Sequence, residues 1–131
     1  SDVYKRQDVI DYGEPVTTKG LNMLYGPGND LVSATALTAA GAHMVLFSTG
    51  RGTPFGAPAP TLKIATNSQL AARKKTWIDF NAGVVADGER TLDEAGADLY
   101  RLVLDVASGK QTCAEKKGFR EISIFKDGVV L

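Results

Sequence analysis

The feature that most constrains the fold is residues 43–56, HMVLFSTGRGTPFG, where an uncharged apolar run ends in a loop with three glycines and one arginine. Residues 44–47 do not alternate apolar with polar side chains, so we predict a strand buried on both faces. Ligands bind beyond the carboxyl ends of strands in open α/β sheets. No helix or strand signal appears from Thr49 to Pro60, and compact domains keep such long loops mostly for function. We therefore expect a site there, with an ordinary connection as the alternative.

Strand and helix signals alternate before this loop. Residues 21–25 predict a short strand that ends at Gly26-Pro27-Gly28. Asn29 or Asp30 then caps a predicted helix through Ala40, followed by Gly41 as the residue after its carboxyl cap. Residues 21–48 are therefore expected to form a βαβ unit with a right-handed crossover between parallel strands.

The alternation continues after the loop. Residues 61–66 predict a third strand, and Asn67 or Ser68 caps a short helix that ends near Lys75. Further elements are expected at residues 77–81 (extended), 91–108 (a helix opened by the capping box of Thr91 and Glu94), 112–118 (a short helix with Thr112 and Glu115 at the same spacing) and 121–125 (a final strand). This order predicts an α/β, Rossmann-like layered domain with a mainly parallel sheet flanked by helices.

Periodicity also predicts which side chains share one core. They are Leu21, Leu46, Phe47, Ile64, Leu99, Leu102 and Val106. Residues 20–131 are expected to form the domain, since 131 residues suffice for one core. Residues 1–19 are interpreted as a lead-in or the tail of an upstream segment, and their first seven, SDVYKRQ, as non-native. An upstream part outside the chain would leave one sheet face exposed as an apolar contact surface.

Composition excludes several classes of function. Fifteen basic and fifteen acidic side chains give zero formal net charge, which argues against nucleic acid or an anionic membrane as a partner. Residues 73–75 and 116–117 are basic, but each cluster lies near a predicted helix end, where cations offset the helix dipole. The single cysteine, Cys113, cannot form an internal disulfide, and no signal sequence or membrane span is evident, so we expect a cytoplasmic protein.

Several residues near the loop are candidate ligand contacts. Gly50, Gly52 and Gly56 do not lead into a helix, which argues against a dinucleotide fingerprint. Arg51 suits a carboxylate clamp, because its guanidinium offers two parallel donors, and a structural ion pair is the alternative. Lys63 is a candidate charge partner or proton carrier, with an edge or solvent-facing lysine as the alternative.

Polar residues beyond the third strand are weaker candidates. Asp79 and Asn81 are two apart in an extended segment, so both side chains are expected on one face, where they would suit a hard metal ion or substrate hydroxyls. Turn or backbone capping is the alternative for this pair. Asn67 suits substrate binding or a helix cap. His43 lacks a second ligand nearby and is interpreted as structural.

Five motifs together carry a family resemblance. They are GLNMLYGPGNDLVSATAL (20–37), GAHMVLFSTGRGTPFG (41–56), PTLKIATN (60–67), WIDFNAG (77–83) and LVLDVASGK (102–110). In this order they resemble the C-terminal region of the altronate and galactarate dehydratases, from Gly20 to Leu131. The resemblance implies that the chain is a piece of a longer sugar-acid hydro-lyase, which uses a divalent metal, typically Fe(II). It also implies a Rossmann-like parallel sheet.

The resemblance also implies a chemistry for the loop. Dehydration of a polyhydroxy acid removes a proton next to a carboxylate, holds the resulting charge with a cation and protonates the departing hydroxyl. Thr49, Arg51 and Thr53 would suit the carboxylate and hydroxyls, whereas most metal ligands are expected from upstream domains of the same enzyme. Altronate is the expected sugar acid, with galactarate as the alternative that the motifs do not separate. A non-catalytic folding or assembly module is the other alternative, and a homodimer stays open.

Overall fold

The computed structural model describes residues 6–125. The strands are β1 (Arg6–Ile10), β2 (Leu21–Leu24), β3 (Val45–Thr49), β4 (Thr61–Ala65) and β5 (Phe80–Asn81). The helices are α1 (Asp30–Ala39), α2 (Ser68–Arg73), α3 (Gly83–Ala86), α4 (Leu92–Ala107) and α5 (Cys113–Lys116). All strand pairs among residues 6–125 are parallel, which confirms an α/β fold with parallel sheets and helices around them. Within the described range no helix is long and apolar enough to cross a membrane.

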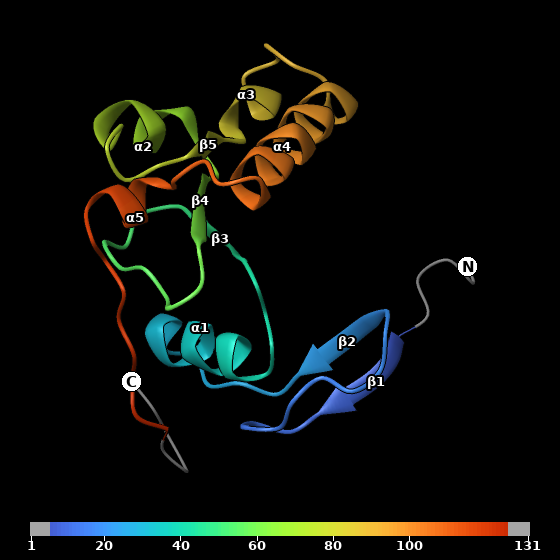
Figure 1. Ribbon diagram of the computed structural model, residues 1–131. Helices are drawn as coiled ribbons and strands as arrows, with labels where there is room; N and C mark the ends of the chain where they lie inside the picture. The colour runs from blue at the N-terminus through green and yellow to red at the C-terminus, as the bar shows by residue number, and fades with distance from the viewer. Residues whose placement is uncertain (1–5, 126–131) are drawn as a thin grey trace.

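The described strands form two separate sheets instead of one. β1 pairs with β2, and a second sheet has the order β3-β4-β5. Figure 1 shows the β1–β2 pair set apart from the other sheet, beside α1. The expected βαβ unit over residues 21–48 is therefore wrong, because β2 and β3 do not share a sheet. The segment interpreted as a lead-in or the tail of an upstream segment contributes a strand, since Arg6–Ile10 pairs along β2.

The β3 strand lies at an edge of its sheet among the described residues. Its burial alternates, and the Leu46 side chain is 51% exposed. The prediction of a strand buried on both faces is therefore wrong, as is the placement of the loop beyond a central strand. The central strand is β4, whose Leu62 and Ala65 are fully buried. The loop still follows the carboxyl end of β3, next to β4.

The core lies between β3, α1 and the second half of the long loop. Ala34, Val45, Phe55 and Ala57 form its buried cluster, and Leu31 and Phe47 pack against it. Val106 is buried as predicted, whereas the predicted core residues Leu21 and Leu46 are about half exposed. Phe47, Ile64, Leu99 and Leu102 are of intermediate burial.

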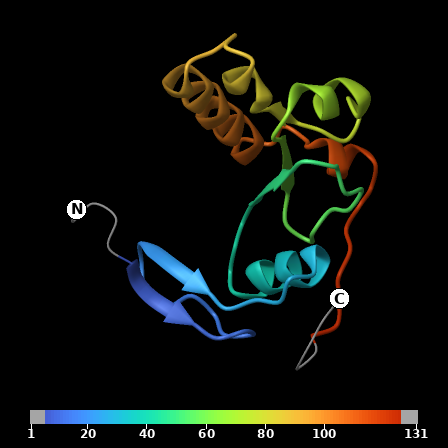
Figure 2. The same cartoon turned by 180° about the vertical axis from the view of Figure 1, so that it is seen from behind.

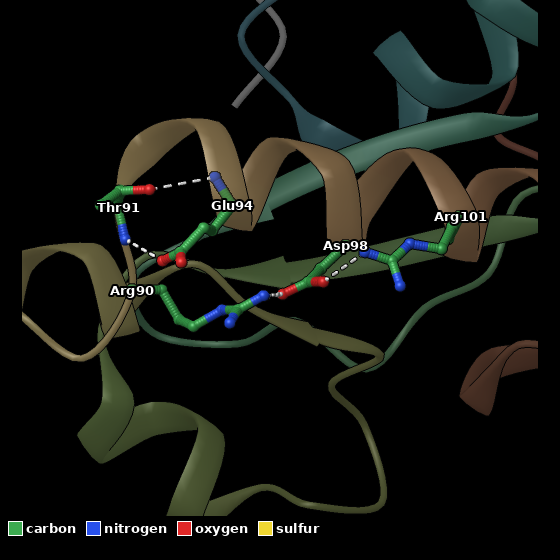
Figure 3. Close-up of polar contacts among 5 residues, drawn as sticks. All are labelled: Arg90, Thr91, Glu94, Asp98 and Arg101. Atoms are coloured by element: carbon green, nitrogen blue, oxygen red, sulfur yellow. Dashed lines mark hydrogen bonds and ion pairs between the residues drawn. The ribbon is translucent and has the colours of Figure 1, made fainter.

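Local sequence signals explain the helices well. The Asn29 side chain accepts hydrogen bonds from the first turn of α1, as an N-cap should, and Gly41 has the left-handed φ of +113° expected after the helix. At α4, the Thr91 side chain accepts from Glu94 N–H and the Glu94 carboxylate accepts from Thr91 N–H. Figure 3 shows this capping box beside Asp98, which pairs with Arg90 and Arg101.

The carboxyl-terminal segment is extended but belongs to no strand. The predicted strand at residues 121–125 is wrong, because this segment is held by separate contacts in place of a ladder. Glu121 N–H donates to the Gly56 carbonyl at 2.7 Å, and Ser123 N–H donates to Thr35 Oγ1 at 3.1 Å. Figures 1 and 2 both show this segment passing α1 on its way from α5. The predicted segment at residues 77–81 forms a strand only at Phe80–Asn81.

Candidate functional site

The first half of the long loop folds back on the end of β3. Gly52 N–H donates to Thr49 Oγ1 at 2.9 Å, and Gly52 has a φ of +85°, a conformation that favours glycine. A Cβ there would also lie 3.2 Å from Leu70 of α2. Residues 49–52 therefore form a tight turn that rests against α2.

Asn67 joins this turn to α2. Its Oδ1 accepts a hydrogen bond from Leu70 N–H at 2.8 Å, which makes it the N-cap of the helix. Its Nδ2 donates to the Gly50 carbonyl at 3.2 Å. The N-cap interpretation is confirmed, and the same side chain also fixes the loop. Both polar atoms of Asn67 already have partners, so a ligand role would compete with these contacts.

Arg51 lies at a cavity of about 350 Å³ between the turn and α2. The cavity is lined by Gly50, Arg51, Asn67, Gln69, Leu70, Arg73 and Lys74. Three of these residues are cations and none is acidic. Among residues 6–125 no carboxylate pairs with Arg51, so the structural ion pair proposed as its alternative is not formed there. Like charges gathered without a counter-ion repel one another, and an anionic ligand would relieve that repulsion.

Lys63 lies beneath the loop and not at this cavity. Lys63 is only 2% exposed and lies on the central strand, so the alternative of an edge or solvent-facing lysine is wrong. Its ammonium donates to the Thr53 carbonyl and lies 4.5 Å from the centre of the Phe55 ring and 5.5 Å from that of Phe47. Burial lowers the pKa of Lys63, while neighbouring carboxylates, Asp79 foremost, oppose that shift.

The contacts of Lys63 suit the anchoring of the loop. A carbonyl and two aromatic faces can stabilise a buried ammonium. The contact of Thr53 with Lys63 is through its backbone, so the loop is anchored at that residue. The catalytic role predicted for Lys63 has no support from this geometry and stays a prediction. The second half of the loop continues into the core, where Phe55 and Phe47 pack edge to face at 5.1 Å.

The side chains of Asp79 and Asn81 form hydrogen bonds with two different sets of residues. The Asp79 carboxylate accepts from Lys63 N–H and from Cys113 N–H, both at 2.7 Å, and so ties β4 to the start of α5. Asn81 donates to Ser68 Oγ and accepts from Gly83 N–H, both at 2.9 Å. Within the described range no group of three possible metal ligands occurs. These contacts fit backbone capping, and the predicted metal role of the pair stays a prediction.

Neither Cys113 nor His43 has a catalytic role that the structure supports. Cys113 has a thiol whose pKa is raised, first by burial and then by the Asp79 carboxylate. A raised pKa leaves the thiol protonated and poorly nucleophilic. His43 is exposed.

The sequence did not single out Arg73 and Lys74 as cavity residues. Both were interpreted as cations at a helix end, and Arg73 does lie in the last turn of α2. Lys74 also lies with its ammonium 3.8 Å from the centre of the Trp77 ring. They reach the cavity because the turn packs against α2 through Gly52 and Asn67. This contact joins residues that are distant in sequence, so no local pattern indicates it.

Known proteins share this sequence over nearly its whole length. Residues 2–130 match the family described as D-galactarate/Altronate dehydratase, C-terminal. The chain is 55% identical over 124 residues to an altronate dehydratase of Escherichia coli K12 and 49% identical over 124 residues to one of Bacillus subtilis 168. Each match covers 95% of the chain and 25% of the relative. A galactarate dehydratase (L-threo-forming) of Escherichia coli K12 is 39% identical over 126 residues, which are 94% of the chain and 24% of that relative.

The extent of these matches decides what they mean. The chain spans about a quarter of the length of the curated relatives it matches. Its own residues are covered almost completely, in the region that the family description places at the carboxyl terminus. The chain therefore belongs to the D-galactarate/altronate dehydratase family, as the C-terminal domain of that family.

Proposed function

We propose that the domain works as part of a sugar-acid dehydratase, a hydro-lyase that converts altronate to 2-keto-3-deoxygluconate plus water. The higher identity to the two altronate dehydratases than to the galactarate dehydratase supports altronate as substrate. Galactarate is the second candidate. The rest of the enzyme would come from the larger part of the relatives that lies outside the matched segment.

The observation that carries this proposal is the cationic cavity at Arg51. A sugar acid presents one or two carboxylates among hydroxyl groups, and a guanidinium binds a carboxylate through two parallel hydrogen bonds. Arg73 and Lys74 add positive charge to the same cavity, and the small residues Gly50 and Gly52 allow a ligand to approach the backbone. The domain would thus hold the carboxylate end of the substrate.

The reaction needs more groups than this cavity offers. A base must remove the proton next to the carboxylate, and an acid must protonate the departing hydroxyl. A divalent metal, Fe(II), is proposed from the family resemblance alone. Residues 6–125 do not fit an iron site, because Asp79 and Asn81 are engaged with the backbone and with Ser68 and no third ligand accompanies them. The metal ligands and the base would therefore come from elsewhere in the enzyme.

The proposed setting follows from composition. Zero formal net charge gives no field that would draw the chain to nucleic acid or to an anionic membrane. A single cysteine suits a reducing compartment, which supports a cytoplasmic enzyme. A homodimer of the whole enzyme is compatible with this setting.

Kinetics of Arg51 variants test the proposal. The chain would replace its matched segment in the Escherichia coli altronate dehydratase, and the chimera would be assayed with Fe(II) on altronate and on galactarate. Loss of a charge-assisted contact is worth about 1.5–3 kcal/mol, or roughly 10- to 150-fold in kcat/KM. We expect Arg51→Ala to lose that much, and Arg51→Lys to be impaired because one point charge cannot replace the two-donor fork.

A matched control separates binding from folding. Arg120 is also exposed but does not line the cavity, so Arg120→Ala should keep kcat/KM. Melting temperatures of the Arg51 variants should stay near that of the unmodified chimera. Unchanged kcat/KM in Arg51→Ala would remove this residue from the site, and no turnover of either sugar acid by the chimera would overturn the proposed reaction.

A folding or assembly module is the second candidate. It is favoured by the contacts of Asn67, Lys63 and Asp79, each of which stabilises the domain itself. Calorimetric titration of the 131-residue chain with altronate and Fe(II) distinguishes the two. Specific binding that disappears in Arg51→Ala supports a retained half-site, and absence of binding supports the module.

A further inference from the structure

The β1–β2 pair has one face made of apolar side chains that no other element among residues 6–125 covers. Val9 and Met23 are partners in the register, so their side chains lie on the same face, and Leu21 shares that face because it is two residues before Met23. These three side chains are 59%, 52% and 51% exposed. We name them the open face.

The contact between the pair and the end of α1 is also incompletely filled. A cavity of about 360 Å³ lies there, lined by Ile10, Val16, Gly20, Leu21, Asn22, Leu24, Leu37, Ala40, Gly41 and Ala42, so Leu21 belongs both to the open face and to the cavity lining. Protein interiors are close-packed, with few voids larger than a water molecule. Leu37 of α1, which lines this cavity, is itself exposed.

Two parallel strands do not form a stable sheet by themselves. Parallel sheets are found almost only with both faces covered, and a lone strand pair is marginal in water. Among the described residues each of these strands has a neighbour on one side only. Figures 1 and 2 agree that the pair stands away from the helices α2 to α5. Its stability therefore requires a further element.

We propose that the open face is the docking surface for the part of the same enzyme that lies outside this domain. The matched segment makes up 25% of each altronate dehydratase, so most of the polypeptide is available in the same molecule at high effective concentration. Its docking element presents apolar side chains to Val9, Leu21 and Met23 and continues the sheet or covers it. A second copy of the domain is the competing occupant.

This inference rests on the proposal that the domain works within a longer enzyme, but not on the reaction. Its first test compares amide hydrogen exchange in the 131-residue chain and in the chimera described above. Amides of β1 and β2 should exchange about tenfold or more slowly in the chimera, because docking joins them to a larger cooperative unit. Amides of β4 serve as the internal reference. Equal protection of β1 and β2 in both proteins overturns the inference, whatever the activity of the chimera.

Charge insertion gives a second test that needs only the chimera. Met23→Glu should lower its melting temperature, since the carboxylate would be buried against an apolar partner. Leu92→Glu is the matched control, because Leu92 is 74% exposed on α4, a helix that stands apart from the β1–β2 pair in Figure 1. Equal melting temperatures of the two variants overturn the inference. Light scattering of the 131-residue chain tests the competing occupant. A dimer that Met23→Glu converts to a monomer would also overturn the inference, because a second copy would then cover the open face.

Discussion

The two parallel sheets differ in what surrounds them. In the sheet β3-β4-β5 the central strand has a neighbour on each side, and Leu62 and Ala65 are fully buried. The pair β1–β2 has the same strand direction, but its open face carries Val9, Leu21 and Met23 in solvent. The difference shows that parallel pairing does not by itself make a core. A layer on each face does, and within the described residues only the central strand β4 is buried on both faces.

The two sheets should differ most in the free energy of unfolding that is lost when one large side chain of each is truncated. Leu62→Ala removes a fully buried side chain and should lower the free energy of unfolding by about 2–5 kcal/mol. Met23→Ala in the 131-residue chain should change it by no more than about 0.5 kcal/mol. Urea denaturation measures both. Similar losses would mean that the open face is packed in solution, and the contrast between the sheets would fail.

Side-chain bridges to the backbone offer a smaller contrast. Asp79 accepts two backbone N–H groups in the covered sheet, and Gln7 Oε1 accepts Leu21 N–H at 2.6 Å in the exposed pair. Hydrogen bonds to charged groups contribute about 1.5–3 kcal/mol, so Asp79→Ala should lower the free energy of unfolding by about 2–4 kcal/mol. Gln7→Ala should cost less than about 1 kcal/mol, because its neutral amide is exposed. Equal melting temperatures of the two variants would contradict this expectation.

The smallest effect is expected at α4, which is held by local contacts instead of by either sheet. The backbone N–H of Thr91 donates to Glu94 and lowers the pKa of that carboxyl, with a further contribution from Arg90. Because the folded-state pKa is below the unfolded one, the stabilisation is complete above the unfolded pKa, near 4.3, and is lost as pH falls through the folded pKa.

Glu94→Gln is the matched variant for this test, because it keeps an acceptor and removes the charge. From pH 5 to pH 3, after correction for intrinsic rates, its α4 amides should lose less protection than those of the unmodified chain, because Asp98 and the other carboxylates of α4 remain in both proteins. Equal losses in both proteins would show that the charge of Glu94 does not stabilise the helix.

Local signals explain which parts of the fold could be predicted. Asn29, Asn67 and the pair Thr91 and Glu94 cap their helices as expected, because a cap depends on residues only a few positions apart. The sheets depend on distant partners. Nothing in the polar segment RQDVI indicated that it would pair with Leu21–Leu24 and remove that strand from the expected βαβ unit. α3 was not predicted, since it has no side-chain cap.

The candidate site also has features that local sequence predicts and features that depend on distant contacts. The turn at Gly50 to Gly52 and the capping role of Asn67 follow from their own residue types. The burial of Lys63 does not, because its partners are a carbonyl ten residues earlier and two rings from different segments. The approach of Arg73 and Lys74 to Arg51 likewise required the packed turn.

The two halves of the long loop have different consequences for how this family can change. Gly56 in the second half is fixed, because a Cβ there would lie 2.3 Å from the Phe119 carbonyl, and Phe55 and Ala57 beside it are buried. Arg51 in the first half is exposed and belongs to no core contact. Under the proposed function, a substitution of Arg51 itself would alter the carboxylate contact while the anchored half keeps the backbone in place. Specificity at this position would then change by a single mutation without loss of the fold.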